Sequence, residues 1–256
     1  MIPMLIVYGA YTHKGKVRKR NEDYFYIPNK TKGVEDIAMV ADGMGGHNAG
    51  DLASRMVVEH ILEYFYQHKN NIKSIDDVRD AIHQAMQNAN QKVYEYSITD
   101  AMYSGMGTTL TLAYFFEDTV CIGHVGDSRG YIIREGELKQ ITKDHSLVQE
   151  LLENGSITPD EMQHHPQKNV ITRALGTDKH VRIDYYEVKM QPNDALILCT
   201  DGLLNHVNIE DKIEFIMSNR LPQHIAEKLG EKALDGGGID NITVVVAKYL
   251  NGAEKR

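Results

Sequence analysis

Four apolar, strand-like runs of this 256-residue chain each border an aspartate in a short turn motif. The aspartates are Asp42, Asp127, Asp201 and Asp240, and the runs beside them are residues 37–41, 120–125, 195–199 and 242–247. If these strands share one sheet system, their tips can bring the four carboxylates together. Such a cluster repels itself and raises its own pKa values unless cations neutralise it. The pattern therefore predicts a site for hard divalent metal ions.

Each of these motifs has a simpler interpretation, because a single Asp-Gly or Asp-Asn pair is more often only a turn. The metal interpretation depends on their joint occurrence and on the glycines beside Asp42, Asp127 and Asp201, which let the backbone approach an ion closely. The candidate ligands are all oxygen atoms, which favours Mg²⁺ or Mn²⁺ over zinc. The sequence contains no HExxH motif, no zinc-type cysteine cluster and no GxxxxGK[ST] loop.

Composition excludes several classes of protein. The formal net charge of −8 argues against a nucleic-acid partner, and 42% hydrophobic residues suffice for a sizeable core. No apolar stretch reaches transmembrane length, and the apolar start lacks the basic residues of a signal peptide, so we expect neither a membrane protein nor a secreted one. Cys121 and Cys199 lie in apolar runs without CxxC spacing, which predicts buried, reduced thiols and a cytoplasmic protein.

Two stretches with helical periodicity, residues 48–68 and 75–96, stand among many β-branched runs. This order predicts an α+β fold in which sheets are buried under helices. Strands are expected at 4–11, 24–27, 37–41, 108–116, 119–125, 131–134, 181–188, 195–199 and 242–249, with 108–134 forming a meander. Further helices are expected at 146–153, from Thr158 onward, at 211–217 and at 225–234.

The stretch from Gly15 to Asp23 changes from basic to acidic within a few residues. Taken alone, such a run is a solvated surface. Arg18 could nevertheless hold two phosphate oxygens at once, because a guanidinium group binds in a planar, two-point manner. Glu22 and Asp23 could accept hydrogen bonds from metal-bound waters.

Eight motifs occur together in a familiar order. They are GxxRxxNED at 15–23, DGMGGH at 42–47, GMGTT at 105–109, VGDSR at 125–129, DHS at 144–146, ITRALG at 171–176, TDGL at 200–203 and DN at 240–241. With them the chain resembles the PP2C-like (PPM family) metal-dependent serine/threonine protein phosphatases, specifically the compact bacterial type. The resemblance covers nearly the whole chain. We interpret the GMGTT motif as shaping a strand entrance.

The resemblance implies a central antiparallel β-sandwich flanked by pairs of antiparallel helices, in four layers ordered α-β-β-α. It also implies a single phosphatase domain over residues 1–250, with a flap at about 145–173 that influences substrate choice and a C-terminal tail at 251–256.

The resemblance further implies a role for individual residues. Asp42 would bridge two metal ions, the Gly43 carbonyl would bind the second ion, and Asp201 and Asp240 would complete the first. We expect these three aspartates to be ligands because their motifs contain no other neutralising partner. Asp127 would bind a third ion, shared with Asp201. Arg18 would bind the phosphate, and Glu22 and Asp23 would lie near the metal-bound waters.

Two positions depart from the family pattern. Met44 stands where eukaryotic members carry a histidine proposed as the general acid, and His47 is a possible proton donor nearby, although a structural role in the loop fits it as well. Asn205 stands where some relatives carry an acidic residue that assists the third metal. Its side-chain carbonyl could still offer a neutral ligand.

We therefore expect hydrolysis of phosphoserine and phosphothreonine in proteins, by a water or hydroxide bridging two Mn²⁺ or Mg²⁺ ions. The expected partners are phosphorylated proteins, among them a membrane-anchored bacterial serine/threonine kinase, and the expected oligomeric state is a monomer. One alternative is a catalytically silent member of the fold used for signalling, although such proteins usually lose metal aspartates. A second alternative is a phosphatase of one partner-switch phosphoprotein.

Overall fold

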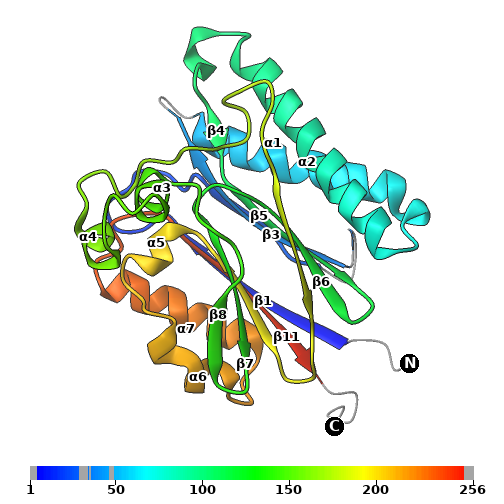
Figure 1. The fold of residues 1–256 in the computed structure, drawn as a ribbon, viewed down its shortest axis with the longest axis vertical. Helices are drawn as coiled ribbons and strands as arrows, with labels where there is room; N and C mark the ends of the chain where they lie inside the picture. The colour runs from blue at the N-terminus through cyan, green and yellow to red at the C-terminus, as the bar shows by residue number, and fades with distance from the viewer. Residues whose placement is uncertain (1–4, 29–33, 35, 46–48, 251–256) are drawn as a thin grey trace.

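The computed structural model describes residues 5–28, 34, 36–45 and 49–250. Two antiparallel sheets pack face to face, and helices cover both outer faces (Figure 1). The first sheet has the order β1 (Leu5–His13), β11 (Ile242–Leu250), β10 (Ala195–Cys199), β7 (Arg129–Arg134), β8 (Glu137–Gln140). The second has the order β2 (Asp23–Tyr26), β3 (Ile37–Met44), β5 (Leu110–Phe116), β6 (Thr119–Val125), β9 (Asp184–Lys189), with β4 (Gly107–Thr108) beside β3. The predicted four-layer α+β sandwich is confirmed.

Helices form the outer layers. They are α1 (Gly50–His68), α2 (Ile75–Ser97), α3 (Leu147–Glu153), α4 (Pro159–His164), α5 (Asp201–Leu204), α6 (Ile213–Met217) and α7 (Pro222–Asp235), with short 3-10 turns at Lys69–Asn71, Ala101–Tyr103 and Glu210–Lys212. α1 and α2 cover the second sheet, and α7 with the shorter α5 and α6 covers the first. No helix in the described ranges is long and apolar enough to cross a membrane.

Apolar packing fills three interfaces between these layers. Ile122 lies between the two sheets, Phe65 and Met86 lie between the second sheet and its helices, and Leu229 of α7 lies between that helix and the first sheet. All four side chains are almost completely buried. Each such side chain contributes about 1.5–3 kcal/mol relative to an exposed one. The sandwich is therefore the stable frame of the molecule.

Local signals define where the helices begin. Ser74 caps α2 by accepting a hydrogen bond from the backbone N–H of Asp77. α7 begins three residues earlier than the predicted Ile225, at Pro222, because proline fits the first helical turn, where no backbone donor is needed. The strands β2 and β9 are each shifted from the expected ranges by one to a few residues.

The predicted meander over 108–134 is wrong in its third strand. β5 pairs with β6, but the chain then crosses to the other sheet, where β7 pairs with β10. The crossing passes through Gly126, whose φ of +112° is strained for other residues, and a Cβ there would lie 2.5 Å from the side chain of Thr109. This crossing places Asp127 between the two sheets. The short polar strand β8, which completes a hairpin with β7, was not predicted.

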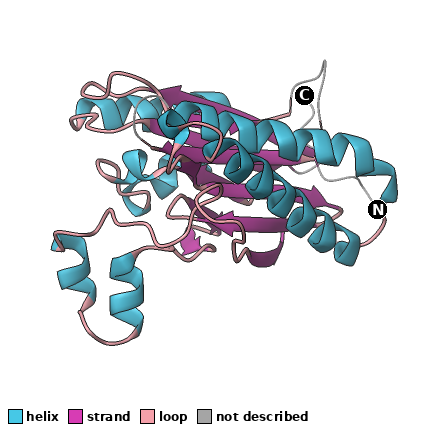
Figure 2. Ribbon diagram, turned by 90° about the horizontal axis from the view of Figure 1, so that it is seen from above, coloured by secondary structure: helices cyan, strands magenta, loops and turns pink. Residues whose placement is uncertain are grey.

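Residues 145–173, which we call the flap segment, carry α3 and α4. The two short helices stand away from the sandwich (Figure 2). α4 contains no buried residue, and only Val148 of α3 is buried. A capping box between Thr158 and Glu161 stabilises the start of α4 instead. Local hydrogen bonds therefore contribute much of the order in this segment.

Candidate metal centre

The four predicted aspartates lie at one end of the sandwich. Asp42 is near the end of β3, Asp127 follows β6, Asp201 is the first residue of α5, and Asp240 lies two residues before β11. Asp23 at the start of β2 is the register partner of Asp42. In addition to burial, the negative charges of the other four carboxylates all raise the pKa of Asp42. The structure therefore does bring these residues together.

Burial and mutual repulsion make these carboxyl groups difficult to ionise. Burial is the main cause, and it raises the pKa of Asp127 to about 7 and that of Asp201 to about 6, with neighbouring carboxylates adding to both shifts. Burial also raises the pKa of Asp23 to about 7, against hydrogen bonds from Thr243 and Thr200 that favour the charged form. The pKa of Asp42 is likewise raised well above its ordinary value, mainly by burial and then by the charge of Asp23. Full ionisation at neutral pH therefore needs a compensating cation.

Three carboxylate oxygens in this cluster lack a hydrogen-bond partner. They are the buried Oδ1 atoms of Asp23, Asp127 and Asp201. A buried, unpaired oxygen is costly, and hard divalent cations prefer oxygen ligands of this kind. Among residues 5–28, 34, 36–45 and 49–250, no three acidic, histidine or cysteine side chains already form a complete ligand set. The donors thus fit Mn²⁺ or Mg²⁺ in kind.

The GMGTT motif holds the backbone of Asp42. The N–H of Thr109 donates to the Asp42 carbonyl at 2.9 Å, and the N–H of Asp42 donates to Thr109 Oγ1 at 3.0 Å. Thr108 Oγ1 donates to the same carbonyl at 2.9 Å. Thr109 Oγ1 also lies 2.7 Å from Ser128 Oγ, a contact that the sequence did not indicate. Thr108 and Thr109 thus hold Asp42 in position through hydrogen bonds to its backbone.

Because Gly43 has no side chain, the first residue of α1, Gly50, can lie directly against it. A Cβ on Gly43 would lie 2.0 Å from the carbonyl oxygen of Gly50, so no larger residue fits without movement. The N–H of Gly43 donates to the Glu22 carbonyl at 3.1 Å, and Ser54 on α1 donates to the same oxygen at 2.6 Å. These contacts fix the position of Gly43. The predicted role of its own carbonyl as a metal ligand stays a prediction.

Arg18 lies at the rim of the cluster. Its Nη2 donates to Asp240 Oδ2 at 2.9 Å, while about half of the Arg18 side chain remains exposed. The hydrogen bond to Asp240 raises the pKa of Arg18 further. The expectation that Asp240 has no neutralising partner is therefore wrong, because the partner comes from the far end of the sequence. An exposed guanidinium in this position can still turn toward a bound phosphate.

Asn241, to which sequence reasoning assigned no role, holds the loop that carries Arg18. Its Nδ2 donates to the carbonyls of Lys14 and Arg20 at 2.9 and 2.8 Å, and its Oδ1 accepts from the N–H of Glu22 at 2.8 Å. The side chain thus holds the arginine-bearing loop at both ends. The only signal in the sequence was its place in the Asp240-Asn241 motif.

The other predicted residues surround this centre. The Glu22 carboxylate lies beside the start of α1, and its pKa is raised mainly by burial and lowered in part by Arg18. Asp23 lies deeper, where it accepts a hydrogen bond from Thr200 Oγ1 at 2.9 Å. Asn205 follows α5 and lines the cleft described next. His47 lies outside the described residues.

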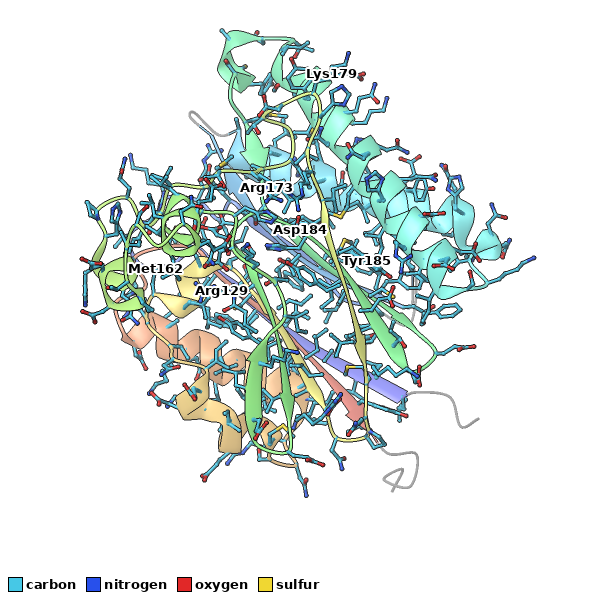
Figure 3. The ribbon with its side chains drawn as sticks, in the orientation of Figure 1. Arg129, Met162, Arg173, Lys179, Asp184 and Tyr185 are labelled. Atoms are coloured by element: carbon cyan, nitrogen blue, oxygen red, sulfur yellow. The ribbon has the colours of Figure 1, made fainter. Side chains whose placement is uncertain are left out.

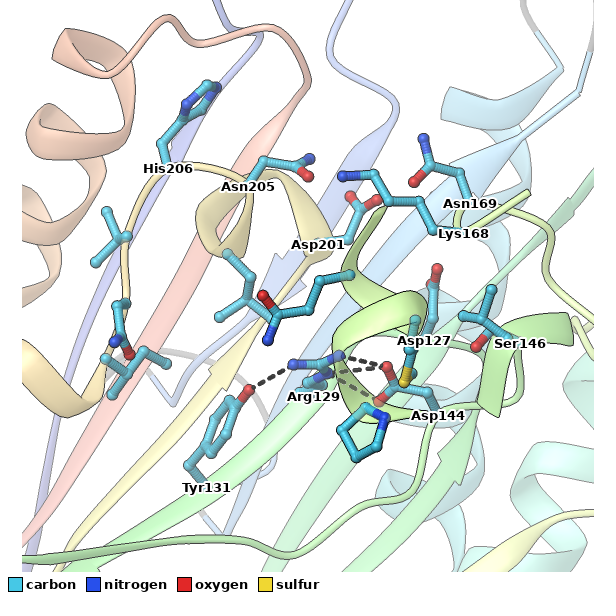
Figure 4. Close-up of a pocket in the computed structure, with 18 of the residues that line it drawn as sticks. Asp127, Arg129, Tyr131, Asp144, Ser146, Lys168, Asn169, Asp201, Asn205 and His206 are labelled. Atoms are coloured by element: carbon cyan, nitrogen blue, oxygen red, sulfur yellow. Dashed lines mark hydrogen bonds and ion pairs between the residues drawn. The ribbon is translucent and has the colours of Figure 1, made fainter. Parts of the chain in front are cut away.

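A cleft of about 940 Å³ opens beside the carboxylates (Figure 4). Asp127 and Asp201 line it, together with α4 of the flap segment and residues 204–210. Arg129 donates to both oxygens of Asp144 at 2.7–2.9 Å and to the Tyr131 hydroxyl at 3.1 Å. Where the flap segment ends, Arg173 donates to Asp184 of β9 at 2.9 Å (Figure 3).

A four-layer sandwich with buried carboxylate oxygens that lack hydrogen-bond partners and an exposed arginine at one end has the features of a divalent-metal enzyme acting on an anionic substrate. The family model described as "Protein phosphatase 2C" matches residues 12–234. The chain belongs to this family and is a phosphoprotein phosphatase.

Relatives from other bacteria agree with this assignment. The chain is 38% identical to "Serine/threonine phosphatase stp" of Listeria monocytogenes over 237 residues, which cover 93% of each protein. It is 37% identical to "Serine/threonine protein phosphatase PstP" of Mycobacterium tuberculosis over 250 residues, which are 98% of this chain and 46% of that protein.

Solved structures show the same fold. The Mycobacterium tuberculosis PstP structure superposes with a TM-score of 0.86 at 36% identity, covering 96% of this chain and 99% of that one. A second structure, the catalytic domain of PstP in complex with two manganese ions, superposes with a TM-score of 0.83 at 34% identity, covering 97% of this chain and all of that one.

Proposed function

We propose that this protein hydrolyses phosphoserine and phosphothreonine in proteins with the help of two Mn²⁺ or Mg²⁺ ions. The observation that carries the proposal is the group of buried, unpartnered Oδ1 atoms on Asp23, Asp127 and Asp201 beside the exposed Arg18. The names of the Listeria and Mycobacterium relatives, and the two manganese ions in one PstP structure, support the substrate class and the cofactor.

We assign the ligands of two ions to Asp42, the Gly43 carbonyl, Asp201 and Asp240, and those of a third ion to Asp127 and Asp201. When bound, the ions supply an activated water and neutralise charge on the phosphoryl oxygens. Asn205 is a candidate neutral ligand at the edge of the third position.

The surrounding residues position the substrate. Arg18 turns from Asp240 to the phosphate and holds two of its oxygens. Glu22 and Asp23 accept hydrogen bonds from waters in the centre and orient them. The leaving serine or threonine oxygen needs a proton, and Met44 cannot donate one. We therefore place proton delivery on the Asp127 side of the cluster, which opens to the cleft.

We further propose a single phosphatase domain over 1–250, acting as a cytoplasmic monomer, whose flap segment influences substrate choice. A bacterial serine/threonine kinase is the proposed partner, since its phosphorylated form is a suitable substrate. A catalytically silent signalling module is the competing function. The presence of all the metal aspartates argues against it.

The test compares hydrolysis of p-nitrophenyl phosphate and of a phosphothreonine peptide by the purified protein, with and without Mn²⁺. We expect turnover of both substrates only with the ion. Arg18→Ala should lower kcat/KM roughly 10- to 150-fold while metal content is retained, because one charged hydrogen-bonding partner contributes about 1.5–3 kcal/mol.

Arg20→Ala is the matched control. Its guanidinium belongs to the same loop but lies 3.9 Å from Asp51, and it should have little effect. Absence of Mn²⁺-dependent turnover on both substrates would favour the silent module.

A further inference from the structure

Three neighbouring strands of the first sheet carry a threonine at the end nearest the carboxylates. These residues are Thr12 of β1, Thr243 of β11 and Thr200, which directly follows β10. Thr12 is the register partner of Thr243, and the N–H of Thr200 donates to the Thr243 carbonyl at 3.0 Å. The three threonines therefore form one row across the sheet.

The inward faces of these strands are apolar up to this row. Side chains alternate between the two faces of a strand. The residues two positions away from the threonines lie in the apolar core between the sheets, and they are Ala10, Leu198 and Val245. The same spacing places the threonine side chains on the inward face, where Thr200 and Thr243 are completely buried. One threonine in a strand needs no explanation, but a buried row of hydroxyl groups needs hydrogen-bond partners.

The hydroxyl groups of this row lead to Asp23, the first residue of β2 in the other sheet. Thr200 Oγ1 accepts from the N–H of Thr243 at 3.0 Å and donates to Asp23 Oδ2 at 2.9 Å. The Oγ1 atoms of Thr12 and Thr243 lie 2.8 Å apart, and Asn21 Nδ2 donates to Thr12 Oγ1 at 2.8 Å. Asn21 Oδ1 accepts from the N–H of Asp23 at 3.3 Å, which closes the network.

These hydrogen bonds have one direction. Burial raises the pKa of Asp23, and hydrogen bonds from Thr243 and Thr200 act against that shift. An ionised carboxylate can only accept hydrogen bonds, so both threonines are donors to Asp23. Because the Thr243 proton is used in this way, Thr12 is the donor in its contact with Thr243. The chain of donors thus runs from Asn21 at the surface to the buried Asp23.

One oxygen of Asp23 is left over. Its Oδ2 is held by Thr200, whereas its Oδ1 is buried and has no hydrogen-bond partner. Asp23 is also the register partner of Asp42, so it belongs to the carboxylate cluster. The carboxylate therefore has one fixed oxygen and one that remains available to a group in the metal centre.

We propose that Thr200 and Thr243 are positioning residues for the hydrolysis, which fix the Asp23 carboxylate so that its Oδ1 orients a water in the metal centre. Thr12 and Asn21 hold the outer end of the chain. This inference rests on the proposed function and extends its machinery beyond the ligands and Arg18.

Two substitutions at Thr200 separate its hydroxyl group from the rest of the side chain. Valine keeps the branched shape but cannot donate, and serine keeps the hydroxyl. Thr200→Val should lower kcat roughly 10-fold with little change in KM, as for other residues that support a metal site from outside. The loss should be equal on p-nitrophenyl phosphate and a phosphothreonine peptide, because both need the same water. Thr200→Ser should keep most of the activity.

Mn²⁺ binding, measured by calorimetric titration, does not depend on turnover. Thr200→Val should bind Mn²⁺ roughly 10-fold more weakly, and Thr200→Ser nearly normally. Thr119→Val is the matched control and should change neither property. Thr119 is also a buried strand threonine, and its hydroxyl donates to Asp118 at 3.0 Å, but it lies at the end of β6 that is remote from Asp127.

Thr12→Val decides the question if Thr200→Val does not fold, because Thr12 is exposed. It breaks only the outer link of the chain. It should lower kcat roughly 2- to 10-fold on both substrates, as for the loss of one hydrogen bond.

Three results would overturn the positioning role. The first is normal kcat and Mn²⁺ affinity in Thr200→Val. The second is an equal loss in Thr200→Ser, which would make packing and not the hydroxyl the cause. The third is a loss confined to the phosphopeptide. Absence of Mn²⁺-dependent turnover of both substrates by the unmodified protein would instead reject the proposed function, and the Mn²⁺ titrations would then decide the role of Thr200 by themselves.

Discussion

The sandwich and the flap segment both line the cleft, but different interactions hold them in place. The strands β3, β6 and β10 that lead to the aspartates consist almost entirely of buried residues, whereas α4 has none. The flap segment is attached mainly by polar contacts, such as Arg173 with Asp184 and the N–H of Gly126 donating to His145. The difference teaches that the carboxylates need a rigid frame, while the opposite wall of the cleft can move at a low free-energy cost.

The largest expected effect comes from the rigid side. Asp42→Asn should lower turnover roughly 1,000-fold or more, because the ions contribute several kcal/mol of transition-state stabilisation. The same change removes a buried carboxyl group that is difficult to ionise, so the metal-free variant should be at least as stable as the unmodified protein. Steady-state kinetics measures the loss of turnover, and thermal unfolding measures the stability. Asp80→Asn, at an exposed position, is the control for both measurements. Near-normal turnover of Asp42→Asn at saturating Mn²⁺ would contradict the ligand assignment.

A pair of core truncations measures the contrast in stability directly. Ile122→Ala, between the sheets, should lower the free energy of unfolding by about 2–5 kcal/mol. Val148→Ala removes the one buried side chain of α3 and should cost only about 1 kcal/mol, seen chiefly as faster proteolysis of the flap segment. Denaturant unfolding with limited proteolysis distinguishes the two. Equal losses would mean that the flap segment is part of the same cooperative unit as the sandwich.

Removal of metal should make the stability depend on pH. The folded-state pKa values of Asp23 and Asp127 are about 7, above the ordinary value of 3.8, so their contribution to stability is present at low pH and is lost as pH rises through 7. The loss is about 1.4 kcal/mol for each pH unit between the unfolded and folded pKa values, so most of it falls between about pH 4 and 7. Chelator-treated protein should still unfold at a lower temperature at pH 8.5 than at pH 6.5, because the last part of the loss, roughly 1 kcal/mol or less for each of the two carboxyl groups, falls in this interval. Added Mn²⁺ should restore stability most at pH 8.5.

Two further observations make this test specific. Asp127→Asn should flatten the pH dependence, and an unchanged profile would speak against the carboxylate cluster as its origin. His124 acts in the opposite direction only at lower pH, because burial lowers its pKa to about 3 and stability is lost as pH falls below its unfolded value of 6.5. The comparison between pH 6.5 and 8.5 avoids that range.

The smallest expected effect concerns the attachment of the flap segment. Arg173→Gln removes the 2.9 Å contact with Asp184 and should change the free energy of unfolding by less than about 1 kcal/mol. Amide hydrogen exchange in the flap segment should nevertheless become faster, while exchange in β3 and β10 stays slow. Arg182→Gln is the control, because Arg182 lies 3.7 Å from the same carboxylate and is largely exposed. Equal amide hydrogen exchange of the flap segment in the Arg173→Gln and Arg182→Gln variants would show that Arg173 does not anchor this segment.

Local patterns predicted much of this molecule. The apolar runs beside Asp42, Asp201 and Asp240 became strands, and the periodicity of residues 75–96 became α2, because neighbouring residues along the chain decide such elements. The ordered motifs then identified the family. The strand β8 was missed because three of its four residues are polar, and one apolar residue, Leu138, is too little to show the alternation that marks a half-buried strand.

Contacts between distant segments could not be predicted in this way. The hydrogen bond from Thr200 to Asp23 joins residues 177 positions apart, and the ion pair of Arg18 with Asp240 joins residues 222 positions apart. Neither leaves a pattern within any short stretch of sequence. For the same reason the crossing of the chain at Gly126 was interpreted as one more turn of a meander, although glycine there was a local sign of an unusual backbone.

The position of β11 has a consequence for the way the protein is made. Among the strands that the structure describes, β1 lies at the edge of its sheet and pairs only with β11. Arg18 and its loop are held by Asp240 and Asn241 just before β11. A ribosome delivers the chain from its N-terminus, so β1 and this loop wait unpaired until more than 200 further residues have been synthesised. Pairing over such a sequence distance is slow. The emerging chain should therefore carry no phosphatase activity until translation of β11 is finished.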